Sequence, residues 1–153
     1  MKFSKKILLV TMLMSMFSMA QAVEVGVTGS QDFANRDRQG FGLTVGEHFG
    51  AFSATAGFDT YSETSKLNKY SLVGGYDVAK IGSATLTAKA GVAYLDQRAA
   101  GAVDGYAALV GAGLSIPVTT QVAATIDYRY QAGQSKVSNL DGGSVLVGAK
   151  YAF

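Results

Sequence analysis

The chain has 153 residues, a formal charge of +2, one histidine and no cysteine. The missing cysteines exclude disulfides, thiolate nucleophiles and cysteine-ligated zinc, and a single histidine leaves no transition-metal cluster, so we expect no metal and no cofactor. No long run of Lys and Arg offers an electrostatic footprint for nucleic acid, which we therefore exclude as a partner.

The first 22 residues have the pattern of a cleavable signal peptide. Three lysines precede an apolar run from Ile7 to Met19, and the small residues Ala20 and Ala22 mark a cleavage site after Ala22. The run is shorter than the ~20 residues of a membrane-spanning helix, and no positive cluster follows it. Removing residues 1–22 takes away three lysines and no acid, so the formal charge falls from +2 to −1 over residues 23–153. We therefore expect an exported chain with one mature domain, residues 23–153.

Alternation of apolar with polar or very small residues begins directly after Ala22. Val25 and Val27, for example, alternate with Gly26 and Thr28. All 19 glycines follow Ala22 and the only proline is Pro117, which favours strands and turns over helices. The same alternation recurs in eight segments, 23–30, 40–46, 52–59, 70–78, 85–94, 108–116, 121–130 and 144–153. Segments of about ten residues suit tilted membrane strands, so the sequence predicts an all-β, eight-stranded antiparallel up-and-down transmembrane β-barrel.

The connections between these segments alternate in character. Short turns are expected around Phe49-Gly50, Lys80-Ile81-Gly82 and Pro117-Val118-Thr119, and these should face the periplasm. More polar connections should face outward, and they are expected at Ala34 to Arg38, Ser62 to Lys66, Asp96 to Gly105 and Ala132 to Gly142. An even number of strands then leaves both mature termini in the periplasm.

A water-soluble β-sandwich or small soluble barrel would show the same alternation. Two features favour the membrane. The apolar face carries no charge in the middle of any predicted strand, and aromatic residues gather near strand ends, where amphipathic rings sit at lipid headgroups. The aromatic residues in question are Tyr70, Tyr94, Tyr106, Tyr128, Tyr130, Tyr151 and Phe153.

The final strand ends in Gly148-Ala149-Lys150-Tyr151-Ala152-Phe153, with aromatic residues at alternate positions up to the carboxyl end. This motif resembles the sorting signal of bacterial outer-membrane barrels, which the barrel assembly machinery reads, and an edge strand can be recognised by strand addition. Gly148, Tyr151 and Phe153 are the candidate assembly-signal residues.

With this motif, the mature chain resembles the OmpX and OmpA-transmembrane-domain group of eight-stranded barrels, or the wider outer-membrane β-barrel domain family. The resemblance implies a monomer embedded in the outer-membrane lipids of a Gram-negative bacterium, with a side-chain-filled interior. It also implies assembly by the barrel machinery with periplasmic chaperones. Short outer segments depart from the OmpX pattern and weaken the case for surface adhesion.

The predicted lumen receives charges of both signs, which must be paired to be tolerated in a narrow interior. Glu24 and Lys150 lie near the periplasmic rim of the closing seam and form the first expected pair. Lys89 needs an acidic partner from across the lumen. The lumen-facing polar set is Glu24, Thr44, His48, Asp59, Asp77, Lys89, Asp127, Arg129 and Lys150.

The function expected from these features is a non-enzymatic integral membrane protein with a structural or surface-interaction role. The alternatives are a narrow porin-like channel through the charged lumen, and a carrier of small hydrophobic ligands supported only by Leu95, Leu109 and Leu146. The only histidine, His48, lies beside Glu47 at a periplasmic turn, where we expect a solvated rim residue. No catalytic residues are recognisable, so no enzyme activity is expected.

Overall fold

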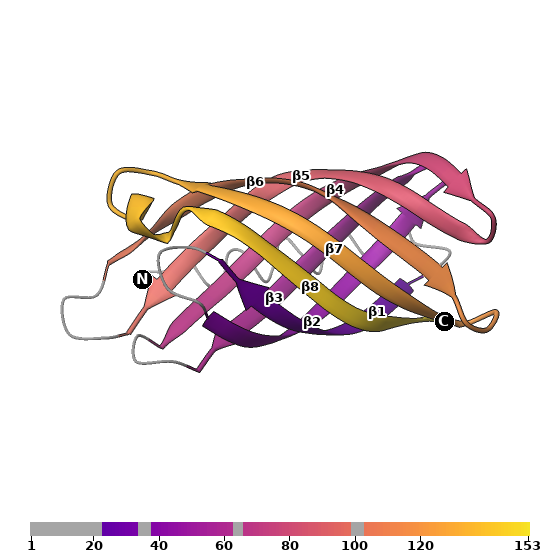
Figure 1. Cartoon of the computed structure of the whole chain (residues 1–153), viewed down its shortest axis with the longest axis horizontal. Coiled ribbons are helices and arrows are strands. Elements are labelled where there is room, and N and C mark those ends of the chain that lie inside the picture. The colour runs from indigo at the N-terminus through magenta and orange to yellow at the C-terminus, as the bar shows by residue number, and fades with distance from the viewer. Residues whose placement is uncertain (1–22, 34–37, 63–65, 99–102) are drawn as a thin grey trace, which may run out of the picture.

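The computed structural model describes residues 23–33, 38–62, 66–98 and 103–153 as one closed antiparallel barrel (Figure 1). Residues 1–22, with the expected cleavage residues Ala20 and Ala22, lie outside the described part. The barrel strands are β1 (Val23–Asp32), β2 (Arg38–Phe49), β3 (Phe52–Tyr61), β4 (Leu67–Ile81), β5 (Ala84–Gln97), β6 (Asp104–Pro117), β7 (Val122–Gly133) and β8 (Gly142–Ala152). The eight-stranded antiparallel barrel predicted from the alternation is confirmed.

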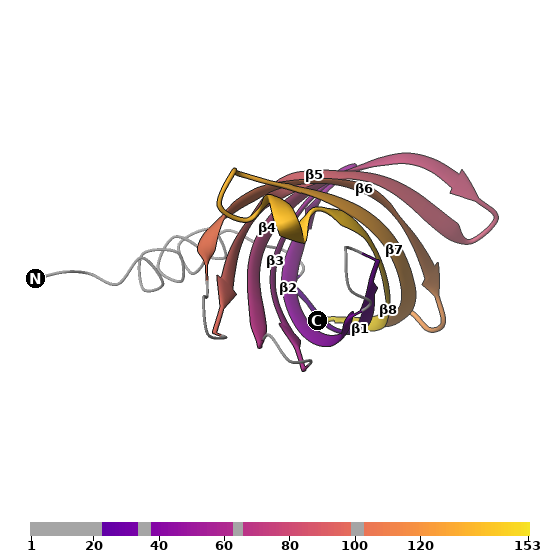
Figure 2. The ribbon, with the colours of Figure 1, turned by 60° about the vertical axis from the view of Figure 1, so that its left-hand side comes forward.

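Each strand pairs with its sequence neighbour, and β1 pairs with β8 to close the ring seen in Figure 2. The closing register runs from Glu24 opposite Ala152 to Asp32 opposite Ser144. The end of the barrel with the tight turns, which include Gly50 and Gly82 at positive φ, is called the short-turn end below. The opposite end is called the long-connection end. Val23 and Phe153 meet at the short-turn end, where the Phe153 amide donates to the Val23 carbonyl over 3.0 Å.

Several strands run further toward the long-connection end than the sequence pattern predicts. Arg38, Asp96 and Asp104 were expected in connections, but they lie inside strands, as do Ala132, Gly133 and Gly142. Asp32 pairs with Arg38, and Asp96 pairs with Asp104. Backbone pairing in an antiparallel hairpin continues as long as the two chains stay in register, whether or not the side chains are apolar.

Side chains alternate between the two faces of the barrel as predicted. The outward positions of β2 carry Phe41 and Leu43, which are half exposed, and the same holds for apolar residues around the ring. Aromatic pairs mark both ends of this apolar surface. Phe52 packs on Tyr76 toward the short-turn end, and Phe58–Tyr70 and Tyr94–Tyr106 lie toward the other end, with ring centroids 5.0, 5.1 and 5.2 Å apart. No helix in the described ranges is long and apolar enough to cross a membrane.

An apolar core fills the interior at the long-connection end. The connection from β7 to β8 contains a short 3₁₀ helix, η2 (Ser138–Leu140), and it buries Val137 and Leu140 completely or almost so against Tyr61, Leu67, Leu95 and Leu109. Gly105 and Gly133 make room for Val137, because a Cβ on either glycine would lie 3.2 or 2.8 Å from its methyl groups. The turn of η2 is visible at this end of the ring in Figure 2.

Candidate functional site

The other half of the lumen is hollow. A cavity of about 250 Å³ lies between the strands, lined mainly by hydroxyl and charged side chains. A second space of about 190 Å³ shares Glu24, Thr85, Ser115 and Lys150 with it and reaches the turn between β6 and β7. The cavity is therefore continuous with the short-turn end, and we call it the vestibule. In the described part of the barrel, side chains pack together in the long-connection half, and the other half holds the vestibule. A lumen closed by its side chains stays a prediction.

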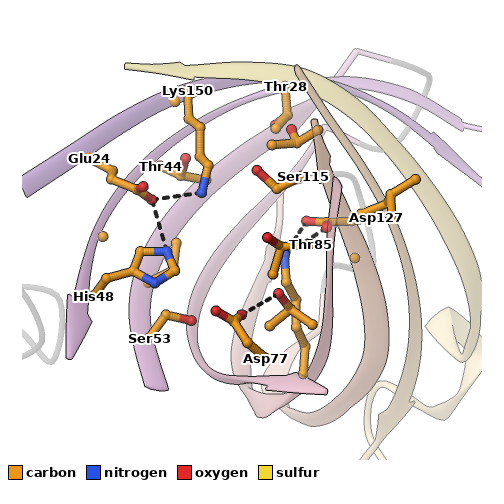
Figure 3. A pocket seen from close by; sticks show the side chains of 18 of the residues that line it. Glu24, Thr28, Thr44, His48, Ser53, Asp77, Thr85, Ser115, Asp127 and Lys150 are labelled. Atoms are coloured by element: carbon orange, nitrogen blue, oxygen red, sulfur yellow. Dashed lines mark hydrogen bonds and ion pairs between the residues drawn. The ribbon is translucent and has the colours of Figure 1, made fainter. Parts of the chain in front are cut away.

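Alternation along β1, β2 and β8 places three polar side chains together at the mouth of the vestibule (Figure 3). The Lys150 Nζ donates to Glu24 Oε2 over 3.0 Å, and the His48 Nε2 lies 3.4 Å from the same oxygen. The structure thus brings together Glu24 and Lys150, the pair expected across the closing seam. His48 is not merely a solvated rim residue, because its side chain turns inward to Glu24 and is only 31% exposed. We call these three residues the mouth cluster.

A second charged cluster lies deeper, on β5 and β7. The Lys89 ammonium donates to both carboxylate oxygens of Asp127, over 2.7 and 2.8 Å, which supplies the acidic partner expected for Lys89. The Arg129 Nη2 donates to Asp127 over 3.2 Å, as the shared face of these two residues allows. Because Asp127 and Arg129 are both more than nine-tenths buried, this pairing is what makes the charges tolerable there. We call Lys89, Asp127 and Arg129 the deep cluster.

The remaining two acids of the expected lumen network stand apart from these clusters. Asp77 accepts a 2.8 Å hydrogen bond from Thr87 at a bulge in β4, and the described residues include no ion pair to it. Asp59 is buried in the filled half, opposite Lys69 in the pairing of β3 with β4. The structure therefore divides the expected network into separate groups.

The sequence reasoning missed Lys69, whose side chain is fully inside the lumen. Its ammonium donates to the Tyr61 hydroxyl over 3.0 Å and lies 5.2 Å from the centre of that ring. The alternation of side chains between the two faces of the strand could have placed Lys69 in the lumen. Lys69 shares a face with Ser71 and precedes the predicted start of its strand at Tyr70 by one position, so a longer strand would have placed it inside.

Leu95, Leu109 and Leu146, which suggested a hydrophobic-ligand carrier, are all buried in packed surroundings and do not line the vestibule. The vestibule wall offers few apolar side chains, so this hypothesis loses its support. The described residues hold no group of three or more His, Cys, Asp or Glu side chains that could bind a metal ion.

The candidate assembly-signal residues lie at the closing seam and beyond it. Gly148 pairs with Thr28 of β1, in close contact with that strand. Tyr151 and Phe153 place their rings edge to face at the short-turn end, with centroids 5.0 Å apart. Recognition of these residues by an assembly machinery stays a prediction.

No protein-family model and no curated protein sequence matches the chain. Solved structures do. The N-terminal β-barrel domain of Pseudomonas aeruginosa OprF superposes with a TM-score of 0.75 at 20% identity, over 88% of this chain and 98% of that domain. The chain has the fold of the small outer-membrane β-barrels.

Two further outer-membrane structures support this assignment of the fold. Pseudomonas aeruginosa OprG has a TM-score of 0.65 at 9% identity, over 88% of this chain and 96% of that one. Neisserial surface protein A has a TM-score of 0.61 at 15% identity, over 86% and 96% of the two chains. At these identities the outer-membrane barrels share their architecture with this chain, and function must be argued from its own residues.

Proposed function

We propose that the chain is an integral outer-membrane protein of a Gram-negative bacterium, exported by a cleaved signal peptide, with a structural and non-enzymatic role. The fold shared with outer-membrane barrels and the apolar outer surface bounded by aromatic pairs support this location. The short-turn end would face the periplasm. Because the closed sheet leaves no strand edge within the membrane, the protein is proposed to be a monomer among outer-membrane lipids.

The observation that carries the structural role is the filled half of the lumen. Leu95, Leu67 and Tyr61 are at most 1% exposed, and the connection with Val137 and Leu140 packs on top of them. A solute entering the vestibule meets this apolar core before it could leave at the long-connection end. An eight-stranded barrel offers no second path around such a core.

Two measurements on the purified protein test this proposal. The folded barrel should migrate differently from the boiled protein in a denaturing gel, and it should stay silent in planar bilayers at all voltages. Identical migration before and after boiling, together with solubility without detergent, would overturn the membrane barrel. Regular single-channel steps from protein that is folded by the gel criterion would overturn the closed lumen.

A narrow channel is the second candidate, because the vestibule already makes half of the lumen accessible to water. If the filled half opens, the deep cluster becomes the charged constriction. Lys89→Ala and Arg129→Ala should then change the conductance or ion selectivity, whereas a bilayer that stays silent with both variants speaks for the closed barrel.

A further inference from the structure

The inner end of the vestibule presents hydrogen-bond donors that no described residue accepts. Thr28 Oγ1 and Arg129 Nε have no partner, and both residues are more than nine-tenths buried where they line the cavity. The Lys89 ammonium also keeps one of its three donors, since Asp127 takes two. Buried donors without acceptors are costly, so this end of the vestibule suits an oxygen acceptor from a ligand or from water.

The vestibule is also electrically polarised along its length. The deep cluster combines the cations Lys89 and Arg129 with one carboxylate, Asp127, and is therefore net positive. Toward the mouth, the carboxylates of Glu24 and Asp77 are accompanied by one cation among the described residues that line the vestibule, Lys150, when His48 is neutral, so this end is net negative. Figure 3 shows the mouth cluster on one side of the hollow and Asp127 on the other, with Asp77 below and between them.

The register gives the spacing of the two ends. Lys89 and Arg129 both pair with Gly111 of β6 and so flank it on the two neighbouring strands, and Asp77 pairs with Thr87, two residues from Lys89 along β5. Two residues of a strand rise roughly 7 Å. The volume of about 250 Å³ is several times the ~30 Å³ of one liquid water molecule, so a small organic molecule fits.

We propose that the vestibule binds a small extended zwitterion, with its carboxylate at Thr28, Lys89 and Arg129 and its ammonium at Asp77. A ligand with a single charge is attracted by one end of the vestibule and repelled by the other, because the two ends carry opposite net charges. An α-amino acid carries both charges but holds them too close together to reach both ends. The matching class is an ω-amino carboxylate, in which several methylene groups separate the ammonium from the carboxylate.

The test is a titration of the folded, purified protein in nanodiscs, followed by NMR of ¹⁵N-labelled arginine. The Arg129 Nε–H resonance reports directly on the unpartnered donor. The probes are 4-aminobutyrate, its two halves butyrate and butylamine, and glycine as the short zwitterion. We expect 4-aminobutyrate to shift this resonance saturably, with a Kd about fivefold below that of butyrate, since a partly exposed ion pair adds up to about that factor.

Two conservative variants separate the two ends of the site. Asp77→Asn should remove the advantage of 4-aminobutyrate over butyrate and leave butyrate binding unchanged. Thr28→Val keeps the side-chain volume but removes the donor, so it should weaken both ligands about fivefold. The matched controls are Asp96→Asn and Thr60→Val, which change the same groups at positions that do not line the vestibule and should bind like the wild type.

Heat-modifiable migration confirms that each variant is folded before it is titrated. Equal affinities for 4-aminobutyrate, butyrate and glycine in the wild type would overturn the proposal, because they would show binding without recognition of charge spacing. A folded protein whose Arg129 resonance does not move would also overturn it and would assign the unpartnered donors to water alone.

Discussion

At the scale of single residues, three lumen-facing glycines allow neighbouring strands to approach closely. A Cβ added to Gly91, Gly111 or Gly148 would lie 2.1 or 2.2 Å from a backbone oxygen of the next strand. No side chain can move aside to relieve such a contact, since the obstacle is the backbone itself. These positions therefore need glycine for space, and their backbone dihedrals require nothing special.

Gly148→Ala should destabilise the closing seam, because its Cβ would meet the Val27 carbonyl of β1. We expect a loss of about 1–3 kcal/mol in the free energy of unfolding, the usual cost of overpacking. The control is Gly29→Ala on the neighbouring position of the same seam, where the nearest atom is 3.9 Å away. Urea unfolding of both variants in lipid vesicles measures the difference, and equal midpoints would contradict the steric argument.

The deep cluster offers a second test at this scale. Asp127→Ala would leave Lys89 and Arg129 without their shared carboxylate, and we expect a loss of about 3–5 kcal/mol, as for other buried pairs that lose one partner. Arg98→Ala breaks the exposed 3.7 Å contact with Asp96 and should cost less than about 1 kcal/mol. Equilibrium unfolding of the two variants compares them. Similar losses of stability in the two variants would contradict this prediction. They would mean that water in the vestibule solvates Lys89 and Arg129 well enough to compensate for the missing Asp127 carboxylate.

At the scale of elements, the alternation of side chains was sufficient to predict eight strands and which face of each strand points inward. The strand ends were less predictable. Phe41 and Leu43 alternate clearly with glycines, whereas Asp96 and Asp104 look like connection residues although they pair across β5 and β6. Pairing near the long-connection end depends on backbone register, which leaves no apolar pattern, so Lys69 and Arg38 were not recognised as lumen residues.

The candidate site was predictable only in part, for a similar physical reason. The alternation of side chains predicts that Glu24, Lys150 and Lys89 face the lumen. It does not predict how deep in the lumen each one lies, because depth depends on the stagger between neighbouring strands. The vestibule also depends on the apolar core, and two of the nine buried residues of that core, Val137 and Leu140, come from the connection around η2. A loop that folds into a barrel has no periodic signal.

The connection around η2 should contribute measurably to stability. Leu140→Ala removes a side chain that is 1% exposed, and we expect a loss of about 2–4 kcal/mol in the free energy of unfolding. Val118→Ala, in the turn between β6 and β7, removes an apolar side chain that is 67% exposed and should change it by less than about 0.5 kcal/mol. Urea unfolding in the same vesicles measures both. If Leu140→Ala behaves like the turn variant, the connection does not pack as described.

At the scale of the whole molecule, the distribution of polarity is inverted relative to a water-soluble protein. Large apolar side chains such as Val27, Phe41 and Val110 are outside and about half exposed, while Lys69, Asp59 and Arg129 are inside and buried. Such an exterior is typical of a protein that is surrounded by hydrocarbon. The free energy of unfolding in lipid vesicles should therefore depend on where a charged residue is placed on this outer surface.

Leu43→Arg places a cation at the middle of the outward face of β2. In a bilayer we expect it to cost about 2–4 kcal/mol, whereas the same change at Val118, in a short turn, should cost at most about 1 kcal/mol. Unfolding in vesicles of defined lipid measures this dependence on depth. A surface that faces water would accept arginine equally well at both positions, and equal stabilities would therefore contradict a membrane location.

The vestibule gives the molecule a direction that the symmetric ring of strands does not have. In the proposed orientation the lumen is closed at the end that faces the environment and open at the end that faces the periplasm. Molecules in the medium would reach Lys89 and Lys150 only after crossing the membrane by another route. A ligand of the vestibule would therefore come from the periplasm. Occupancy of the vestibule would follow the concentration of that ligand in the periplasm and not its concentration in the medium.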